Sequence, residues 1–444
     1  MPAPERIVLQ VETTTDDPTE EFLVTSLPGQ PKVSFKQYAG YINIDEDHDR
    51  ELFFYFVEAE TDPASKPLVL WLTGGPGCSS VGVAFFEHGP FRTQGKTIVK
   101  NDYSWNKEAN MLYLDSPAGV GFSYSKNSFF YNELNDELTA RDNVKFLSRW
   151  FVPFSKYKKH DFYIAGESYG GHYVPQLADI LVKEKWNLKG IALGNPLLDF
   201  DTDFNAPDIF LWSHSMISDD TYHLKNTVCN SSRLIRESIT GSLSSECQYV
   251  SNITDQQISN KTSKFDVSAD VCLQSQADVL VKKSRKGKDV CAQEETIKYF
   301  NQEDVQTAFH AKLVDADSWE LCGRVSQTYD ALDREIPIVG IVGELVQSGV
   351  RVLAYSGDQD GVVPFIGTRH LIKNLASSLK LKTSVEYRAW IETEQVGGWT
   401  EVYGDNELSF ATIRGGSHTP AENQPERLLV LFQAFVSGNV LPSQ

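Results

Sequence analysis

The sequence predicts an α/β fold with a mostly parallel central sheet and a mainly helical, cysteine-rich insertion. Short apolar runs recur along the chain and end in turn-forming residues, which is typical of strands buried on both faces. Residues at helical spacing separate some of these runs. Because strands that alternate with helices form a parallel sheet covered by helices, this order predicts the fold class.

The expected elements follow an acidic, turn-rich segment of about twenty residues at the start of the chain. Residues 38–44 and 51–59 predict two strands joined by the polar turn at 45–49. Apolar residues from Ala140 to Phe151 recur at helical spacing and predict a helix. The runs that predict buried strands span 67–72, 111–114, 161–165 and 190–193.

The amino-acid composition changes between about residues 200 and 330, where polar residues dominate and most of the cysteines lie. The pattern of a buried strand returns at 351–357. We therefore expect a core formed by residues 1–200 and 331–444, interrupted by an inserted, cap-like subdomain at 201–330.

The composition excludes some classes of protein. With 41 Lys and Arg against 60 Asp and Glu, the net charge is −19, and the one short basic cluster spans 282–288. A nucleic-acid-binding surface needs more positive charge than this. No apolar stretch reaches the roughly 18 residues of a membrane span. A hydrophobic fraction of 41% is sufficient for a large core.

Cysteines and glycosylation motifs indicate an oxidising compartment. The chain has six cysteines, an even number, and three Asn-X-Ser/Thr motifs lie in the polar segment, at Asn230, Asn252 and Asn260. Their clustering favours a glycosylated protein with disulfides. Because no apolar signal sequence follows Met1, we expect a mature form whose signal has been removed.

The strongest chemical motif is Gly-x-Ser-x-Gly at residues 166–170, directly after a predicted strand and before a predicted helix. In this sharp turn the serine, here Ser168, is exposed at the end of the sheet as a nucleophile. A serine hydroxyl needs a neighbouring base held by an acid. In the α/β-hydrolase fold, which this motif indicates, the acid and then the histidine follow the serine along the chain.

Few residues beyond Ser168 can complete this set. Asp358 and Asp360 both follow the strand at 351–357, and only His370 and His418 come after them. His370 lies at the start of a predicted helix, whereas His418 lies in a glycine-rich loop after a predicted strand, which suits a catalytic base. Backbone amides for an oxyanion are expected from Gly75 and Tyr169.

Five motifs in order resemble those of the serine carboxypeptidase family, and most closely its plant serine carboxypeptidase-like branch. They are WLTGGPGCSS at 71–80, EHGPF at 87–91, DSPAGVGFSY at 115–124, GESYGGHY at 166–173 and YSGDQD at 355–360. The resemblance extends from about residue 35 to 442. It implies Asp360 as the acid, His418 as the base and a vacuolar or secreted protein. It also implies the disulfides Cys78–Cys322, Cys229–Cys247 and Cys272–Cys291.

The resemblance also implies how a substrate is held. In this family an Asn before Gly-Gly-Pro-Gly and two glutamic acids bind the terminal carboxylate of a peptide; the matching positions are Thr73, beside Gly74, and the pair Glu87 and Glu167. Two carboxyl groups can bind a carboxylate only when they share protons, so acid pH should favour binding. Thr73 in place of Asn weakens the expectation of an exopeptidase. A second departure is the polar stretch at 419–423, where an apolar one is usual.

The function expected first is hydrolysis of C-terminal peptide bonds through an acyl-enzyme on Ser168. The alternative is a carboxypeptidase-like acyltransferase that moves an acyl group from a glucose ester to an alcohol or amine. A lyase or a binding protein on the same scaffold is a third hypothesis. The substrate is a peptide or small acyl ester, and the chemistry requires neither a metal nor an organic cofactor. The sequence leaves a homodimer open, and the basic run at 282–288 is either a cleaved internal linker or a solvated loop.

Overall fold

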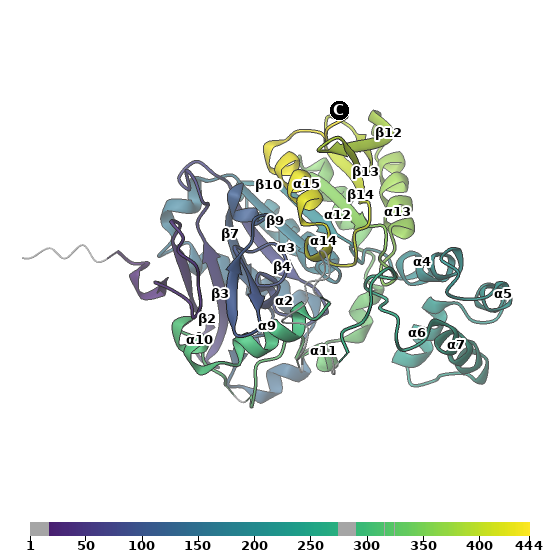
Figure 1. The fold of residues 1–444 in the computed structure, drawn as a ribbon, viewed down its shortest axis with the longest axis horizontal. Helices are drawn as coiled ribbons and strands as arrows, with labels where there is room; N and C mark the ends of the chain where they lie inside the picture. Colours follow the sequence, from purple (N-terminus) through teal and green to yellow (C-terminus); the bar gives the residue numbers. More distant parts are fainter. Residues whose placement is uncertain (1–16, 274–289, 315, 324) are drawn as a thin grey trace, which may run out of the picture.

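A twelve-stranded sheet forms the centre of the part of the chain described by the computed structural model, which covers residues 17–273, 290–314, 316–323 and 325–444 (Figure 1). The strands lie in the order β1-β2-β3-β7-β4-β9-β10-β11-β14-β13-β12, and β8 pairs with β3. The six strands from β7 to β14 in this order are parallel, and the outer strands are antiparallel. The predicted α/β fold with a mostly parallel centre is therefore confirmed.

Strands β2, β3, β4, β7, β9, β10, β11 and β14 coincide with predicted runs, whereas β1, β8, β12 and β13 were not predicted. The bounds are Leu23–Val24 (β1), Gln37–Asp45 (β2), Arg50–Val57 (β3), Leu68–Thr73 (β4), Asn110–Leu114 (β7), Tyr124–Ser125 (β8), Phe162–Glu167 (β9), Leu188–Gly194 (β10), Arg351–Gly357 (β11), Thr383–Glu392 (β12), Gln395–Tyr403 (β13) and Leu408–Ile413 (β14). A separate hairpin pairs Phe91–Gln94 (β5) with Thr97–Lys100 (β6).

Helices cover both faces of the sheet, and each face has its own apolar cluster. Alternate residues of β3 show this, because Phe54 packs into one cluster and Phe53 into the other. The first face is covered by α2 (Asp136–Trp150), α3 (Gly170–Lys183), α12 (Ile338–Gln347) and α13 (Phe365–Ser378). The second is covered by α1 (Ser80–Val83), α9 (Ala292–Phe300), α10 (Glu303–Ala308) and α15 (Pro425–Ser437). Two further short helices are α11 (Val325–Thr328) and α14 (Pro420–Asn423).

The helix expected from the spacing between residues 140 and 151 is α2. Its N-terminus is capped by Asn135, whose side chain accepts a hydrogen bond from the amide of Leu138. The buried face of α2 includes Phe146, Leu147 and Trp150, which pack against the first face of the sheet.

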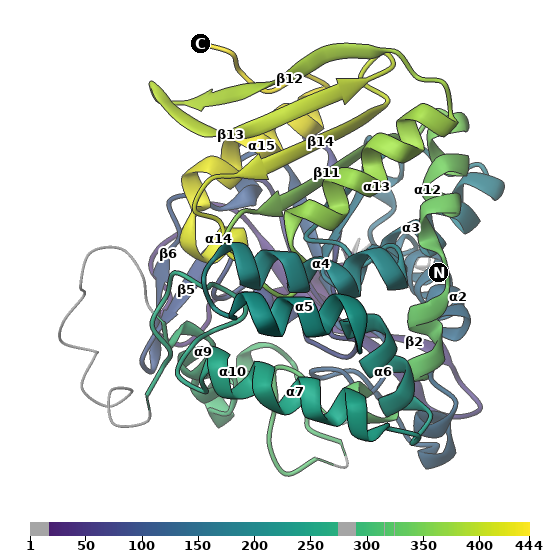
Figure 2. The ribbon, with the colours of Figure 1, turned by 90° about the vertical axis from the view of Figure 1, so that its right-hand side faces the viewer.

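The polar segment after β10 consists of two parts that pack differently. The first part contains α4 (Phe200–Ser213), α5 (Asp219–Thr227), α6 (Ser231–Ile239) and α7 (Ser245–Ile258), which lie together beside the sheet (Figures 1 and 2) and have small apolar clusters of their own. The second part contains α9 and α10, whose buried Tyr299, Phe300 and Val305 belong to the large cluster on the second face of the sheet.

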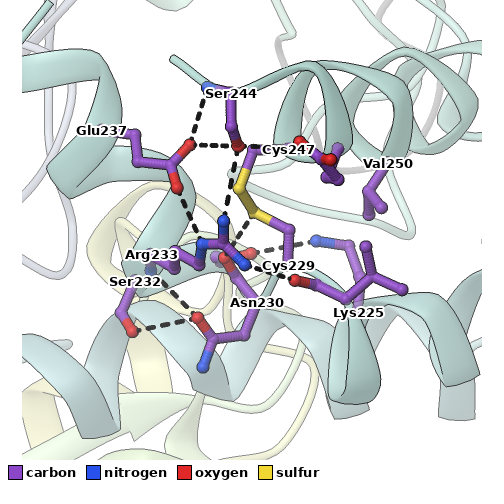
Figure 3. Close-up of a disulfide and its surroundings, with 12 residues drawn as sticks. Lys225, Cys229, Asn230, Ser232, Arg233, Glu237, Ser244, Cys247 and Val250 are labelled. Atoms are coloured by element: carbon purple, nitrogen blue, oxygen red, sulfur yellow. Dashed lines mark hydrogen bonds and ion pairs between the residues drawn. A yellow bond between two sulfur atoms is a disulfide. The ribbon is translucent and has the colours of Figure 1, made fainter. Parts of the chain in front are cut away.

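Three disulfides stabilise these segments, with the pairing that the resemblance implies. Cys78–Cys322 joins the loop after β4 to the segment before α11, and Cys272–Cys291, within the insertion, joins the segment after α7 to the start of α9. Cys229–Cys247 links the end of α5 to α7 (Figure 3). The basic run at 282–288 lies outside the described residues. Among the helices that are described, none is both long and apolar enough to cross a membrane.

Beside the disulfide in Figure 3, Glu237 holds two helices of the insertion together. Its carboxylate accepts a hydrogen bond from Arg233 Nε at 2.7 Å, one turn earlier in α6. The other carboxylate oxygen accepts from the hydroxyl of Ser244, the N-cap of α7, at 2.6 Å. Together with Cys229–Cys247, these contacts fix α6 and α7 to each other.

Candidate active site

Ser168, Asp360 and His418 lie at one edge of the sheet. Ser168 follows β9, Asp360 comes shortly after β11, and His418 lies in the loop after β14. These strands are parallel, and only β10 separates β9 from β11 in the sheet. Because the carboxyl ends of parallel strands point the same way, the three loops meet at this edge.

Ser168 occupies the sharp turn that the motif predicts. Its φ is +58°, its amide donates to Gly194 O at 2.9 Å, and its carbonyl accepts from the amides of Gly171 and Leu197. The flanking Gly166 is required by space, since a Cβ there would lie 2.4 Å from the carbonyl oxygen of Leu72. The turn holds the half-buried Ser168 at the start of α3.

His418 and Asp360 form a buried pair. His418 Nδ1 lies 2.8 Å from Asp360 Oδ2, so Nδ1 carries the hydrogen and Nε2 is left to act on a substrate or on Ser168. Asp358 instead accepts a hydrogen bond from the amide of Gly415 at 2.6 Å. His370 is exposed on α13. Of the alternatives that the residues left open, the structure thus pairs Asp360 with His418.

The surroundings of His418 favour its protonated form. Burial lowers the pKa of the imidazole, but the charge and hydrogen bond of Asp360, together with the charge of Glu167, outweigh burial and raise the pKa of His418 above its ordinary value. An imidazole stabilised in this way can take a proton from a serine hydroxyl and return it later in the reaction.

Sequence reasoning missed two residues that contact this pair. Asn195, directly after β10, donates from Nδ2 to Asp360 Oδ2 at 2.6 Å. Phe265, in the insertion, accepts a hydrogen bond from the amide of His418 at 2.7 Å, and its ring meets the imidazole edge to face. The Gly-Asn-Pro sequence at 194–196, directly after a predicted strand, could have indicated Asn195. Nothing in the polar sequence around Phe265 indicated a contact with His418.

A cavity of about 310 Å³ adjoins His418 on the side of the insertion. It is bounded by the insertion segment from Ser263 to Cys272 and by the loop after His418, which contributes Thr419, Glu422 and Asn423. The cavity therefore adjoins the loop that carries His418, while neither His418 nor Ser168 lines it.

Two backbone amides are available beside Ser168. Within the described ranges, neither the amide of Gly75 nor that of Tyr169 donates a hydrogen bond to another residue. The two turns touch, because a Cβ on Gly74 would lie 2.3 Å from the Tyr169 nitrogen. Both amides thus have the properties of donors to an oxyanion.

Glu87 and Glu167 form a buried pair of carboxyl groups next to the serine. Burial raises the pKa of Glu167 to about 7, although the charge of His418 opposes the shift. Burial and the charges of Glu167 and Glu422 raise the pKa of Glu87 well above its ordinary value. In the described part of the chain, no amide or hydroxyl donates to either carboxylate oxygen of Glu87. A proton shared between the two carboxyl groups fits this arrangement.

Thr73, the last residue of β4, lies directly beside Glu167 in the register of the sheet. Its hydroxyl oxygen accepts a hydrogen bond from the indole of Trp71 at 2.7 Å, and its amide donates to Ser80 Oγ at 3.0 Å. The hydroxyl hydrogen of Thr73 is therefore its one remaining polar donor.

These features define the class of protein as an α/β-hydrolase fold with a serine, histidine and aspartate at the edge where that fold carries its nucleophile. The sequence profile of the family described as serine carboxypeptidase matches residues 28–438. The chain belongs to the serine carboxypeptidase family.

Comparison with individual proteins agrees with this assignment. The chain is 53% identical to serine carboxypeptidase-like 45 of Arabidopsis thaliana, over 95% of this chain and 93% of that protein. It is 51% identical to serine carboxypeptidase-like 46 of the same plant, over 95% and 93%. The structure resembles Kex1Δp, a prohormone-processing carboxypeptidase from Saccharomyces cerevisiae, with a TM-score of 0.76 at 22% identity, covering 95% of this chain and 96% of that one. At this identity the likeness shows the fold.

Proposed function

We propose that this protein is a serine carboxypeptidase that hydrolyses C-terminal peptide bonds through an acyl-enzyme. The observation that carries the proposal is the buried pair of Glu87 and Glu167 beside Ser168. A carboxyl group that keeps its proton can donate a hydrogen bond to the terminal carboxylate of a peptide, whereas two ionised carboxylates would repel it.

The reaction follows from the positions of the side chains. Ser168 Oγ attacks the carbonyl carbon of the last peptide bond while its proton passes to His418 Nε2, and Asp360 stabilises the imidazolium. The amides of Gly75 and Tyr169 donate to the oxyanion. When the C–N bond breaks, His418 returns the proton to the leaving amine, and water then hydrolyses the seryl ester with His418 as base.

The carboxylate site determines which bond is cut. Thr73, Gly74, Glu87 and Glu167 would hold the terminal carboxylate, with the Thr73 hydroxyl as one donor and the shared proton of the glutamic acids as another. Because this proton is held below a pH of about 7, the proposal includes tighter binding of peptides at acid pH.

The direct test is incubation of the protein with a blocked dipeptide at acid pH and measurement of the amino acid released. The matched control substrate is the same dipeptide with its C-terminus amidated, and the control variant is Ser168→Ala. We expect release from the free acid only, and none with Ser168→Ala. If Ser168 reacts with a phosphonofluoridate but no amino acid is released, the peptidase proposal is wrong, whereas the assignment of Ser168 as the nucleophile is retained.

The second candidate is an acyltransferase, and Thr73 is the observation that favours it. A glucose ester has no terminal carboxylate, so a donor site without Asn at this position suits such a substrate. The test is incubation with a glucose ester and an alcohol or amine acceptor. Formation of the new ester or amide in excess of hydrolysis supports the transferase.

The compartment is part of the proposal. The similar proteins are plant serine carboxypeptidase-like proteins, and the chain has three disulfides. We therefore assign the protein to the vacuole or the secretory route, with glycans on Asn230, Asn252 and Asn260, of which the last two are exposed. Mass spectrometry of the natural protein before and after glycosidase treatment tests these three sites.

A further inference from the structure

A buried carboxylate outside the catalytic triad lies at the centre of a hydrogen-bond network next to the oxyanion site. Asp136, the first residue of α2, is 2% exposed. Its Oδ1 accepts from the hydroxyls of Tyr169 at 3.1 Å and Tyr329 at 2.8 Å. Its Oδ2 accepts from His172 Nδ1 at 2.9 Å and Gln176 Nε2 at 2.7 Å. Four donors from two separate segments thus converge on one side chain.

The network requires an acceptor at both oxygens. A carboxylate only accepts, so the hydrogen on His172 lies on Nδ1, and the amide group of Gln176 donates. The backbone amide of Asp136 itself donates to Asp333 Oδ2 at 2.5 Å. Asp136 therefore connects α2 and α3 with the segment around Tyr329, at the end of the insertion.

Aromatic rings enclose Tyr169 on the same side. Its ring stacks on His172 with centroids 4.6 Å apart and an angle of 13°. Tyr173 and Tyr329 meet it edge to face, at 5.2 Å and 5.7 Å. With its hydroxyl bound to Asp136 and its ring in contact with three others, the Tyr169 side chain has one accessible position.

The same residue supplies one of the two amides assigned to the oxyanion. Tyr169 follows Ser168, and its nitrogen lies against Gly74, where a Cβ would come within 2.3 Å. The ring and the backbone nitrogen of Tyr169 are joined through Cβ and Cα. A shift of the buried ring would therefore move this nitrogen. Misplacement of a donor by about 1 Å can cost on the order of 10²-fold in rate.

We propose that Asp136 is a positioning residue for catalysis: it fixes the Tyr169 side chain so that the Tyr169 amide points at the oxyanion formed on the Ser168 ester. This role rests on the proposed acyl-enzyme chemistry but not on the choice between peptide and ester substrates. His172 and Gln176 hold the carboxylate of Asp136 in the orientation that Tyr169 needs.

The test compares an activated ester with its thionoester, in which sulfur replaces the carbonyl oxygen. Sulfur is a poor acceptor, so an intact oxyanion site gives a large ratio of ester to thionoester rates. The variants are Asp136→Asn, which puts an NH₂ group against existing donors, and Tyr169→Phe, which removes one hydroxyl and keeps the backbone. Active enzyme is counted by labelling Ser168 with a phosphonofluoridate.

For Asp136→Asn we expect kcat to fall about tenfold or more, KM to change by less than about threefold, and the rate ratio to fall with kcat. Tyr169→Phe should also lower kcat and the rate ratio, but by a smaller factor than Asp136→Asn. The matched control is Tyr157→Phe, which removes another buried hydroxyl that binds a carboxylate, Glu58 at 2.7 Å, near the amino end of β9. It should leave the ratio unchanged.

An unchanged ratio in Asp136→Asn overturns the positioning role, because a merely structural loss lowers both rates equally. If that variant does not fold, the ratio in Tyr169→Phe decides in the same way. A wild-type protein that neither cleaves the esters nor reacts with the phosphonofluoridate would remove the proposed function and this role with it. If the wild type is reactive but the ester-to-thionoester ratio is the same in the variants as in the wild type, only the positioning role of Asp136 is wrong.

Discussion

Asn195 donates a hydrogen bond of 2.6 Å to Asp360 Oδ2, the same oxygen that lies 2.8 Å from His418 Nδ1. Asn195 is itself held at the end of β10, because its amide donates to Tyr355 O at 2.7 Å and its side-chain oxygen accepts from Gly357 at 3.3 Å. Asn195 therefore connects two neighbouring strands and orients Asp360, the acid of the proposed triad.

The first prediction is that Asn195→Ala lowers kcat by about ten- to a hundredfold, since a hydrogen bond to a charged group contributes about 1.5–3 kcal/mol. In this variant Asp360 would still accept the hydrogen bond from the amide of Val362 at 2.7 Å. Without the Asn195 donor, the negative charge of Asp360 would interact more strongly with the protonated His418. The acid limb of the pH–rate profile should then move to higher pH. Asn187→Ala, at an exposed site, is the control. A profile identical to that of the wild type contradicts the role of Asn195.

The second prediction concerns Thr73→Asn. The carboxamide oxygen can accept from Trp71 Nε1 as the threonine hydroxyl does, and its NH₂ group then adds donors for a carboxylate. We expect KM for a blocked dipeptide to fall about threefold to tenfold, in line with about 0.5–1.5 kcal/mol for one hydrogen bond. KM for an uncharged ester should stay the same, and Thr73→Ser is the conservative control. Weaker binding of the dipeptide by the Asn variant would show that this position does not face the carboxylate.

The third prediction is the pH dependence of peptide binding. As pH rises through about 7, Glu167 loses its proton, and the pair with Glu87 gains a negative charge that repels the substrate carboxylate, so KM should increase. Glu167→Gln carries a permanent donor and should remove most of this increase. Steady-state kinetics from acid to mildly alkaline pH measure the effect. The same alkaline increase in the variant would rule out Glu167 as its source.

Much of the fold and part of the site follow from local sequence patterns. The buried strands, the turn around Ser168 and the helix α2 arise from local periodicity and glycines, which a single sequence displays. Asp358 and Asp360 follow the same strand and have the same chemistry, so spacing alone could not decide between them. The contacts that decide, from Asn195 and His418, depend on how strands far apart in sequence pack together.

The insertion shows a second limit of sequence reasoning. Residues 291–309 look polar, but Tyr299, Phe300 and Val305 pack under the second face of the sheet. Two short helices contain too few turns to display a clear apolar stripe. The proximity of Glu87 to Glu167 was available only through the resemblance, since a loop after α1 and the end of β9 meet through tertiary structure alone.

The fourth prediction concerns Cys229–Cys247, which closes a loop of 18 residues in the insertion. Replacing both cysteines by Ser should lower the free energy of unfolding of this region by about 3 kcal/mol. Because α4–α7 have their own apolar clusters, labelling of Ser168 should keep its wild-type rate. Urea titration followed by limited proteolysis measures the change, and Ser242→Ala, at an exposed site in the same insertion, serves as the control. Loss of Ser168 labelling would show that helices α4–α7 of the insertion support the nucleophile.

The fifth prediction is that the protein becomes more stable as pH falls from neutral. Burial raises the pKa of Asp115 to about 6 and that of Asp203 to about 7, as it does for Glu167. A raised folded-state pKa means that the folded state binds more protons than the unfolded state between the ordinary value and the shifted one. The stabilising contribution is complete below the ordinary pKa and is lost as pH rises through about 6–7.

Thermal unfolding should therefore show a Tm that is a few degrees higher at about pH 5 than at about pH 8. Asp203 allows a local test, because its Oδ2 accepts from the amides of Leu198 and Asp199 while no described residue donates to its buried Oδ1. Asp203→Asn keeps the shape without the charge, so it should raise the Tm at about pH 8 and flatten the profile. Asp220→Asn, exposed in the first turn of α5, controls for the change in net charge of −19. If both variants alter the profile equally, the pH dependence comes from overall charge repulsion rather than from the buried carboxyl group.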